Sequence, residues 1–273
     1  MIPSFKKLFK CQVLDIEMQK RGQVTLFIII AIVIVAVVIL AFILAPKLLP
    51  QMRFAGKAID PETYVQDCIN NVLEPDVELL ASQGGYLKQL ELYIIYKQVH
   101  VGYLCYTNLD NQPCFNQQPF LKDSVEKQLT DDLRSGNIVT SCINEFRDAA
   151  QKQGYDVSVC PSPKFSVNLT ESKVNVPITC QITMTKGQET KTVEKLNPFL
   201  KWPLYEFVLV SREIVDEEIS YGNFGQQAYM MAHPWISIDR FKAESTTIYT
   251  LKEISSSKIF MFAVRNFVKS GGI

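Results

Sequence analysis

The chain has 273 residues, 28 basic and 28 acidic side chains, and 47% hydrophobic residues. Its 12 glycines and 13 prolines are too few for a collagen-like or low-complexity chain, and the apolar content excludes a wholly disordered one. A formal net charge of zero also argues against nucleic-acid binding through bulk positive charge.

Near the N-terminus, residues 24–45 form an apolar segment without a charged residue, and Thr25 is its one polar side chain. A helix of this length reaches about 33 Å, and the hydrocarbon core of a bilayer is about 30 Å thick. Inside a bilayer the backbone groups must bond within the segment. We therefore expect residues 23–45 to form a transmembrane helix that follows a basic leader, residues 1–22.

Charges on either side of this segment predict its orientation. Five basic residues precede it, whereas only Lys47, Arg53 and Lys57 lie within about 15 residues after it. The N-terminus is therefore expected in the cytoplasm and the later residues outside. The apolar segment is too long for a removable secretory signal and no small-x-small site follows it, so we expect it to be retained.

The seven cysteines agree with this orientation, since one precedes the apolar segment and six follow it. An oxidising compartment would let those six form three disulfides and leave Cys11 reduced in the cytosol. Six cysteines permit 15 pairings. Cys105 and Cys114 bracket a turn-rich loop and are the best local pair, and Cys160 with Cys180 and Cys68 with Cys142 would then remain. Ordinary buried thiols are the alternative, and the absence of a CxxC motif argues against zinc.

The start of the apolar segment reads KRGQVTLFIII, residues 20–30. This junction resembles the class III, prepilin-type signal sequence of archaeal pilins and related membrane-anchored surface proteins. The resemblance implies cleavage on the cytoplasmic side, between Gly22 and Gln23, with the helix kept as an anchor or packed into a filament core. Phe27 departs from the bacterial pattern, which has glutamate there. An uncleaved signal anchor is the alternative.

After a juxtamembrane linker, residues 46–59, the first half of the outer part alternates helices and strands. Asp60, Pro61 and Glu62 predict a helix start, and the apolar spacing continues to about residue 80, with a kink or restart at Pro75. Alternating residues 90–96 and 99–105 predict two strands around a turn at 97–98. Two helices follow, at 121–135 and 139–153, the first with a capping box made by Asp123 and Glu126.

The second half is richer in strands. Residues 174–184 alternate most clearly, with Pro177 marking a sheet edge or a bulge. Shorter strands are expected at 165–169 and 189–195, then a helix over 204–219, and C-terminal strands within 235–266, of which 247–251 and 259–264 form a pair. We therefore predict an α+β extracytoplasmic domain at residues 60–268, in one unit or in two (60–136 and 137–268), with a tail at 269–273.

Few residues indicate chemistry. His100 and His233 are the only histidines and lie in no catalytic motif. Glu213 and the acidic run 216–218 fit a solvated helix face better than a calcium loop. Asn168 begins the only N-glycosylation sequon. We expect no catalytic residue, metal or cofactor.

These observations predict a single-pass membrane protein with an extracytoplasmic structural or interaction role. Its expected partners are the membrane and either a second copy or another surface protein. A pilin-like filament subunit is one alternative, although Pro46 and Pro50 would interrupt a continuous filament helix. A surface hydrolase without a recognisable motif is the other.

Overall fold

The computed structural model describes residues 28–36, 59–88 and 91–267. Residues 28–36, inside the predicted span, are helical, and no helix within the described ranges is both long and apolar enough to cross a bilayer. The remainder of the span, the Gly22–Gln23 junction, most of the linker and the tail fall outside those ranges. The chain divides into two units at residues 58 and 59, and the fold of the described residues of the second unit is given below.

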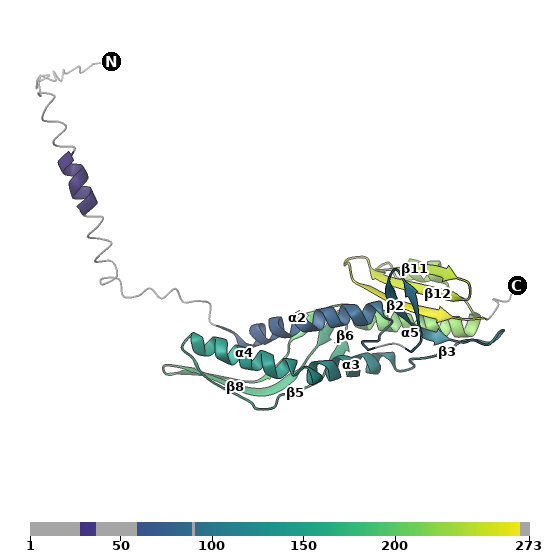
Figure 1. Ribbon diagram of the computed structural model, residues 1–273, viewed down its shortest axis with the longest axis horizontal. Helices are drawn as coiled ribbons and strands as arrows, with labels where there is room; N and C mark the ends of the chain where they lie inside the picture. The colour runs from purple at the N-terminus through teal and green to yellow at the C-terminus, as the bar shows by residue number, and fades with distance from the viewer. Residues whose placement is uncertain (1–27, 37–58, 89–90, 268–273) are drawn as a thin grey trace, which may run out of the picture. The chain divides into compact units, whose positions relative to one another are not determined.

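The second unit has an α+β fold, as expected from the sequence (Figure 1). Its helices are α2 (Pro61–Ser82), α3 (Leu121–Ser135), α4 (Ile138–Lys152), α5 (Leu204–Tyr221) and α6 (Gln226–Ala232). Its strands are β1 (Tyr93–Tyr96), β2 (Val99–Tyr106), β3 (Phe115–Asn116), β4 (Asp156–Val159), β5 (Lys164–Phe165), β6 (Asn168–Thr170), β7 (Lys173–Asn175), β8 (Ile178–Lys186), β9 (Glu189–Leu196), β10 (Phe199–Lys201), β11 (Ile236–Ala243), β12 (Thr246–Glu253) and β13 (Ile259–Arg265).

Helix α2 connects the two ends of the unit (Figure 1). The Asp60 side chain accepts a hydrogen bond from the Thr63 backbone N–H, which confirms the predicted N-cap. The expected restart at Pro75 is wrong, because one continuous helix runs through it. Pro75 is exposed, and the buried Leu73 and Val77 on either side keep the helix packed despite an interior proline.

The C-terminal end of α2 comes unusually close to strand β2. A Cβ atom on Gly102 would lie 2.7 Å from the carbonyl oxygen of Gln83, and Gly84 has a positive φ of 76°. Both positions therefore need glycine, one for space and the other for its backbone conformation. This close approach fixes the helix on one face of the sheet that contains β2.

That sheet runs in the order β1-β2-β13-β12-β11, with β3 also paired to β2. All its pairings are antiparallel except that of β13 with β2. One face packs on the helices, and the other carries a separate apolar cluster that includes Tyr103, Ile248 and Met261. The rings of Tyr96 in β1 and Phe241 in β11 lie 5.2 Å apart, although these strands are at opposite edges, so the sheet curls around this cluster.

Two smaller sheets complete the unit: β10-β7-β6, and β8 flanked by β4, β5 and β9. The predicted strand 174–184 is divided between them at residues 176–177. Pro177 has no N–H to give to a ladder, and the Val176 N–H bonds the carbonyl of Pro198 instead. The proline therefore marks the point where the chain changes sheets.

All six cysteines after the linker are paired, Cys68 with Cys142, Cys105 with Cys114, and Cys160 with Cys180, with S–S distances of 2.00, 1.99 and 1.95 Å. These are the pairs expected from the sequence. Cys68–Cys142 joins α2 to α4, Cys105–Cys114 closes a loop after β2, and Cys160–Cys180 ties the chain after β4 to β8. The sequence left open a division of the domain into two units at residues 136–137. That position falls between α3 and α4, which pack on each other and on α2 within one compact unit.

Candidate interaction surface

Among the described residues, a groove lies between helix α5 and the segment that leads from β3 into α3. Its volume is about 300 Å³, and most of its lining side chains are apolar, including Leu104, Val208 and Leu209. Phe120, at its margin, is 74% exposed. A groove of this size and lining suits an apolar side chain or a short acyl group.

Polar groups stand among these apolar ones. Arg212 is well exposed, and its nearest ion-pair partner, Asp216, is 3.9 Å away. The Ser211 hydroxyl donates to the Val208 carbonyl in its own helix and is fully buried. Arg212 could therefore approach a carboxylate on a group held in the groove, whereas the Ser211 hydroxyl is already used in a hydrogen bond within α5.

A second feature is the hairpin of β1 and β2. Lys97 and Gln98 have φ values of 47° and 67°. Positive φ at both positions defines the type of two-residue turn that best matches the twist of the flanking strands. The structure confirms the turn that the sequence predicted at 97–98. Strand β1 pairs only with β2, so its other side is an edge of the curled sheet.

The backbone groups of β1 alternate between β2 and this edge. The Tyr103 N–H donates to the Leu92 carbonyl, and the register then gives residues 94 and 96 the same orientation toward β2. The N–H and C=O groups of Tyr93 and Ile95 therefore point outward. Within the described residues, no other element bonds these outward groups.

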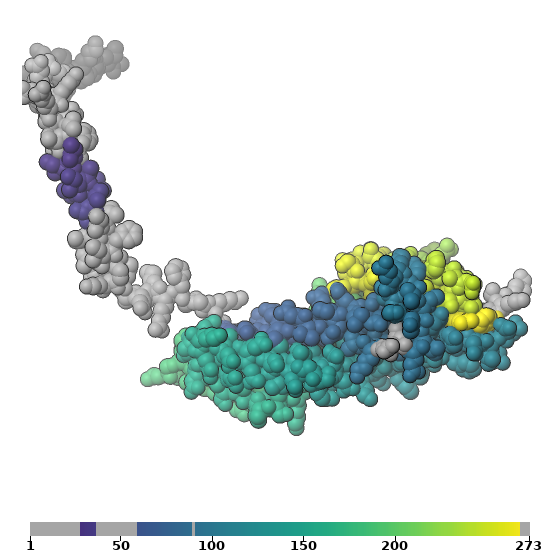
Figure 2. Space-filling model, viewed as in Figure 1, coloured from purple at the N-terminus to yellow at the C-terminus, as the bar shows by residue number. Residues whose placement is uncertain are grey.

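The side chains of the edge are apolar and accessible. Tyr93 is 43% exposed and Ile95 is 65% exposed, while Ile94 and Tyr96 pack against the inner cluster. No residue from 92 to 96 carries a charge. The hairpin lies on the surface shown in Figure 2, where its dark blue atoms adjoin the yellow and yellow-green atoms of the C-terminal strands. An uncharged, open strand edge is the usual template for pairing with another chain.

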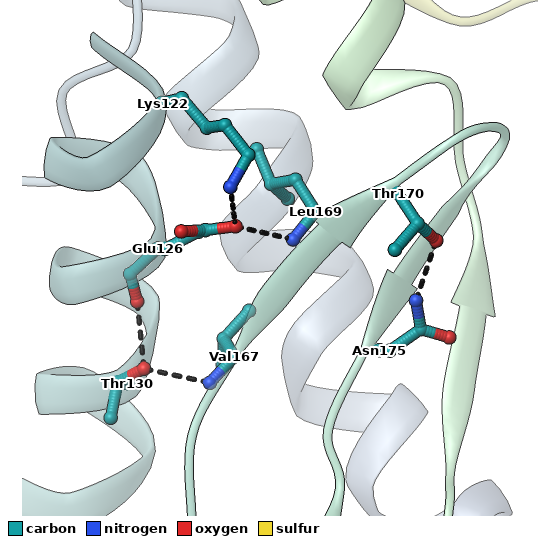
Figure 3. A network of polar contacts seen from close by, with 7 residues as sticks. All are labelled: Lys122, Glu126, Thr130, Val167, Leu169, Thr170 and Asn175. Atoms are coloured by element: carbon teal, nitrogen blue, oxygen red, sulfur yellow. Dashed lines mark hydrogen bonds and ion pairs between the residues drawn. The ribbon is translucent and has the colours of Figure 1, made fainter. Parts of the chain in front are cut away.

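Three other strand edges of the unit, those of β6, β10 and β11, are covered by side chains. Figure 3 shows the case of β6, where the Val167 N–H donates to Thr130 Oγ1 at 2.8 Å and the Leu169 N–H to Glu126 Oε1 at 2.7 Å. Glu126 also pairs with Lys122. The predicted capping box is therefore wrong. Helix α3 begins after Phe120 without a side-chain cap, and the Glu126 carboxylate accepts a hydrogen bond from strand β6 instead.

Strands β10 and β11 are protected in a similar way. Asn70 on α2 donates its amide to the Phe199 carbonyl of β10. On β11, Gln226 donates to the Ile238 carbonyl, and the Ile238 N–H donates to the sulfur of Met230. Strand β9 instead carries exposed charges, such as Lys191 and Glu194. Of these edges, β1 differs in having neither cover nor charge.

The two histidines contact different tyrosines. The His100 ring packs edge-on against Tyr93 at 4.6 Å between ring centroids. The His233 ring stacks on Tyr229 at 4.1 Å, and its Nδ1 lies 3.1 Å from the Tyr229 carbonyl oxygen. Both arrangements are packing contacts at the ends of secondary-structure elements.

The acidic group on α5 is only partly solvated. Glu213 and Asp216 are exposed as expected, but Glu218 is 4% exposed and accepts a hydrogen bond from the Tyr249 hydroxyl. Burial and the neighbouring Glu218 raise the pKa of Tyr249 above its ordinary value, so its hydroxyl stays protonated as a donor. Assigning Glu218 to the solvated face was wrong, because it lies under β12.

Asn168 is exposed on β6, where the sequence placed it, and faces Asn175 of β7 across the ladder. The hydroxyl of Thr170, the third residue of the sequon, accepts a hydrogen bond from the Asn175 amide at 2.6 Å (Figure 3). Glycosylation at Asn168 stays a prediction.

No family model, curated protein or solved structure matches this chain. The groove and the open edge therefore have to be interpreted from their own geometry. Sequence reasoning missed both as binding features. The uncharged run at 92–96 between Glu91 and Lys97 could have indicated the edge, but no local pattern indicates the groove, whose walls are far apart in the chain.

Proposed function

We propose that this chain is a membrane-anchored extracytoplasmic interaction protein. In this proposal residues 23–45 span the membrane, the N-terminus is cytoplasmic, and residues 60–268 present binding surfaces outside the cell. The leader-like junction supports an archaeal surface protein as the closest functional type.

The observation that carries the proposal is the distribution of paired cysteines about the apolar segment. All six cysteines after the segment lie within disulfide distance of a partner, and two of the pairs close loops of 74 and 20 residues. Disulfides persist in oxidising compartments and are rare where glutathione and thioredoxin keep thiols reduced. A folded domain with three of them is best suited to the outside of the cell.

An interaction role is supported by the kind of surface the domain offers. The groove is lined mainly by apolar residues, and the β1 edge exposes backbone donors and acceptors together with apolar side chains. Such surfaces recognise extended chains and apolar groups.

Sidedness can be tested by labelling intact cells that express the chain with a membrane-impermeant amine reagent and mapping the modified lysines by mass spectrometry. We expect Lys191, whose side chain is 62% exposed, to be labelled in intact cells. A cytoplasmic reference protein in the same cells should be labelled only after lysis. Labelling of Lys191 only after lysis would refute the proposal.

The leader can be tested separately by N-terminal sequencing of the protein from washed membranes. Cleavage between Gly22 and Gln23 would give a chain that starts at Gln23, whereas an uncleaved anchor would start at or near Met1. Either result is compatible with anchoring, so this experiment decides only between the processed and unprocessed forms.

A further inference from the structure

We propose that the open edge of β1 pairs with β1 of a second copy of this chain. The two strands would run antiparallel about a two-fold axis at Ile94 and join the two curled sheets into one. The inference deepens the proposed interaction role by naming the partner and the residues that meet it.

The backbone of β1 fits this register. Its outward N–H and C=O groups belong to Tyr93 and Ile95. An axis at Ile94 places Tyr93 of one copy opposite Ile95 of the other, and each such pair can exchange both backbone hydrogen bonds. The cross-strand neighbours are then a tyrosine and a β-branched residue, a favourable combination.

Charge supports the same register. The edge from residue 92 to 96 is uncharged, and it is flanked by Glu91 on one side and Lys97 on the other. With the axis at Ile94, Glu91 of each copy comes beside Lys97 of its partner, so two attractive pairs form. Because the same short strand supplies both partners, the edge is complementary to itself.

The contact is short, so anchoring matters to its strength. Copies held in one membrane share a high effective concentration, which lets weak pairing become significant. This point rests on the proposed function. The pairing itself does not, and it can be measured on the purified chain whatever the outcome of the labelling experiment.

The decisive experiment measures self-association of the full chain in detergent micelles by sedimentation equilibrium, with charge variants of the edge. Glu91→Lys and Lys97→Glu each place like charges together and should weaken association about 5-fold. The double variant Glu91→Lys/Lys97→Glu exchanges the charges and should return the dissociation constant to within about 2-fold of the parent.

A backbone variant tests the strand pairing itself. Ile95→Pro removes an N–H that faces the edge and not β2, so the fold should survive while association weakens more than about 10-fold. An unchanged melting temperature of Ile95→Pro would show that the domain remains folded.

A parent chain that stays monomeric at every concentration would overturn the proposal. So would a double charge variant that associates no better than the single ones. An Ile95→Pro variant that keeps its fold and associates like the parent would also contradict it.

Discussion

The two ends of the α+β unit, residues 59–267, are stabilised in different ways. At one end, α2, α4 and the sheet around β8 are joined by Cys68–Cys142 and Cys160–Cys180, and side chains from α2 and α3 cover the edges of β10 and β6. At the other end, the curled sheet is held by packed aromatic rings and has one short disulfide loop between Cys105 and Cys114.

In the proposed function, this difference separates a stabilising part of the unit from an interacting part. The disulfides of the cross-linked end restrict the unfolded chain over long loops, and side chains cover the edges of β6 and β10. The curled sheet keeps one edge, β1, accessible to another chain. Substitutions that destabilise one end of the unit and not the other test whether the two ends have these different roles.

The largest effect is expected at the longest disulfide loop. Replacing Cys68 and Cys142 by Ala frees a loop of 74 residues and should lower the free energy of unfolding by about 4 kcal/mol. The matched double variant at Cys105 and Cys114, which frees only 9 residues, should lower it by about 2.5 kcal/mol. Urea unfolding measures both, and an equal or reversed order would contradict the loop-length argument.

The next effect concerns the buried pair between α5 and β12. Tyr249→Phe removes the donor to the carboxyl of Glu218 and should destabilise the protein by about 2 kcal/mol, because a buried acceptor loses its hydrogen bond. Tyr229→Phe, which removes a similar bond to the exposed Glu213, is the control and should change stability by no more than about 0.5 kcal/mol. Equal losses in thermal unfolding would show that burial does not distinguish the two contacts.

A smaller effect is expected at the covered edge of β6. Thr130→Val removes the acceptor for the Val167 N–H and should lower stability by about 1 kcal/mol. Thr192→Val alters an exposed contact with Thr183 and should have almost no effect. Amide hydrogen exchange at Val167 gives a second readout, since its protection should fall only in the first variant.

The last effect, of similar size, depends on pH and concerns Asp76 on α2. Burial, and then the nearby carboxylate of Asp132, raise the pKa of Asp76 from 3.8 to about 6. Because the folded state binds the proton more tightly than the unfolded state, this residue's contribution is present below about pH 4 and is lost as the pH rises through 6. Asp76 is only partly buried, so screening by solvent reduces the effect to about 1 kcal/mol.

Asp76→Asn should therefore be more stable than the parent at pH 7 and about equally stable at pH 4. Thermal unfolding at the two pH values checks this. An Asn variant that is less stable at pH 7 would show that the carboxylate makes a favourable contact there.

Much of the fold could be predicted from the sequence because its determinants are local. The apolar spacing of α2, α4 and α5, the two-residue turn at 97–98 and the C-terminal strand pair all follow from residues close together in the chain. The sequence also hints at the Cys68–Cys142 pair, because Cys-Ile-Asn begins a helical stretch that ends in Gly-Tyr at both cysteines, and the structure brings the two helices together.

The errors concern contacts between distant segments. Glu126 was assigned to a local cap, but its partner Leu169 lies 43 residues away. Glu218 was assigned to solvent, but β12 covers it. The pairing of β13 with β2, the walls of the groove and the open edge of β1 likewise depend on the tertiary arrangement, which periodicity does not specify.

The central claim is that the domain after the apolar segment matures in an oxidising compartment, and counting thiols tests it most directly. Cells are treated at harvest with a permeant thiol reagent, and the chain is then unfolded without reductant, labelled again and mapped by mass spectrometry. The account predicts that the six cysteines from Cys68 to Cys180 carry no label, while Cys11, where it is retained, does. Label on all six would contradict it.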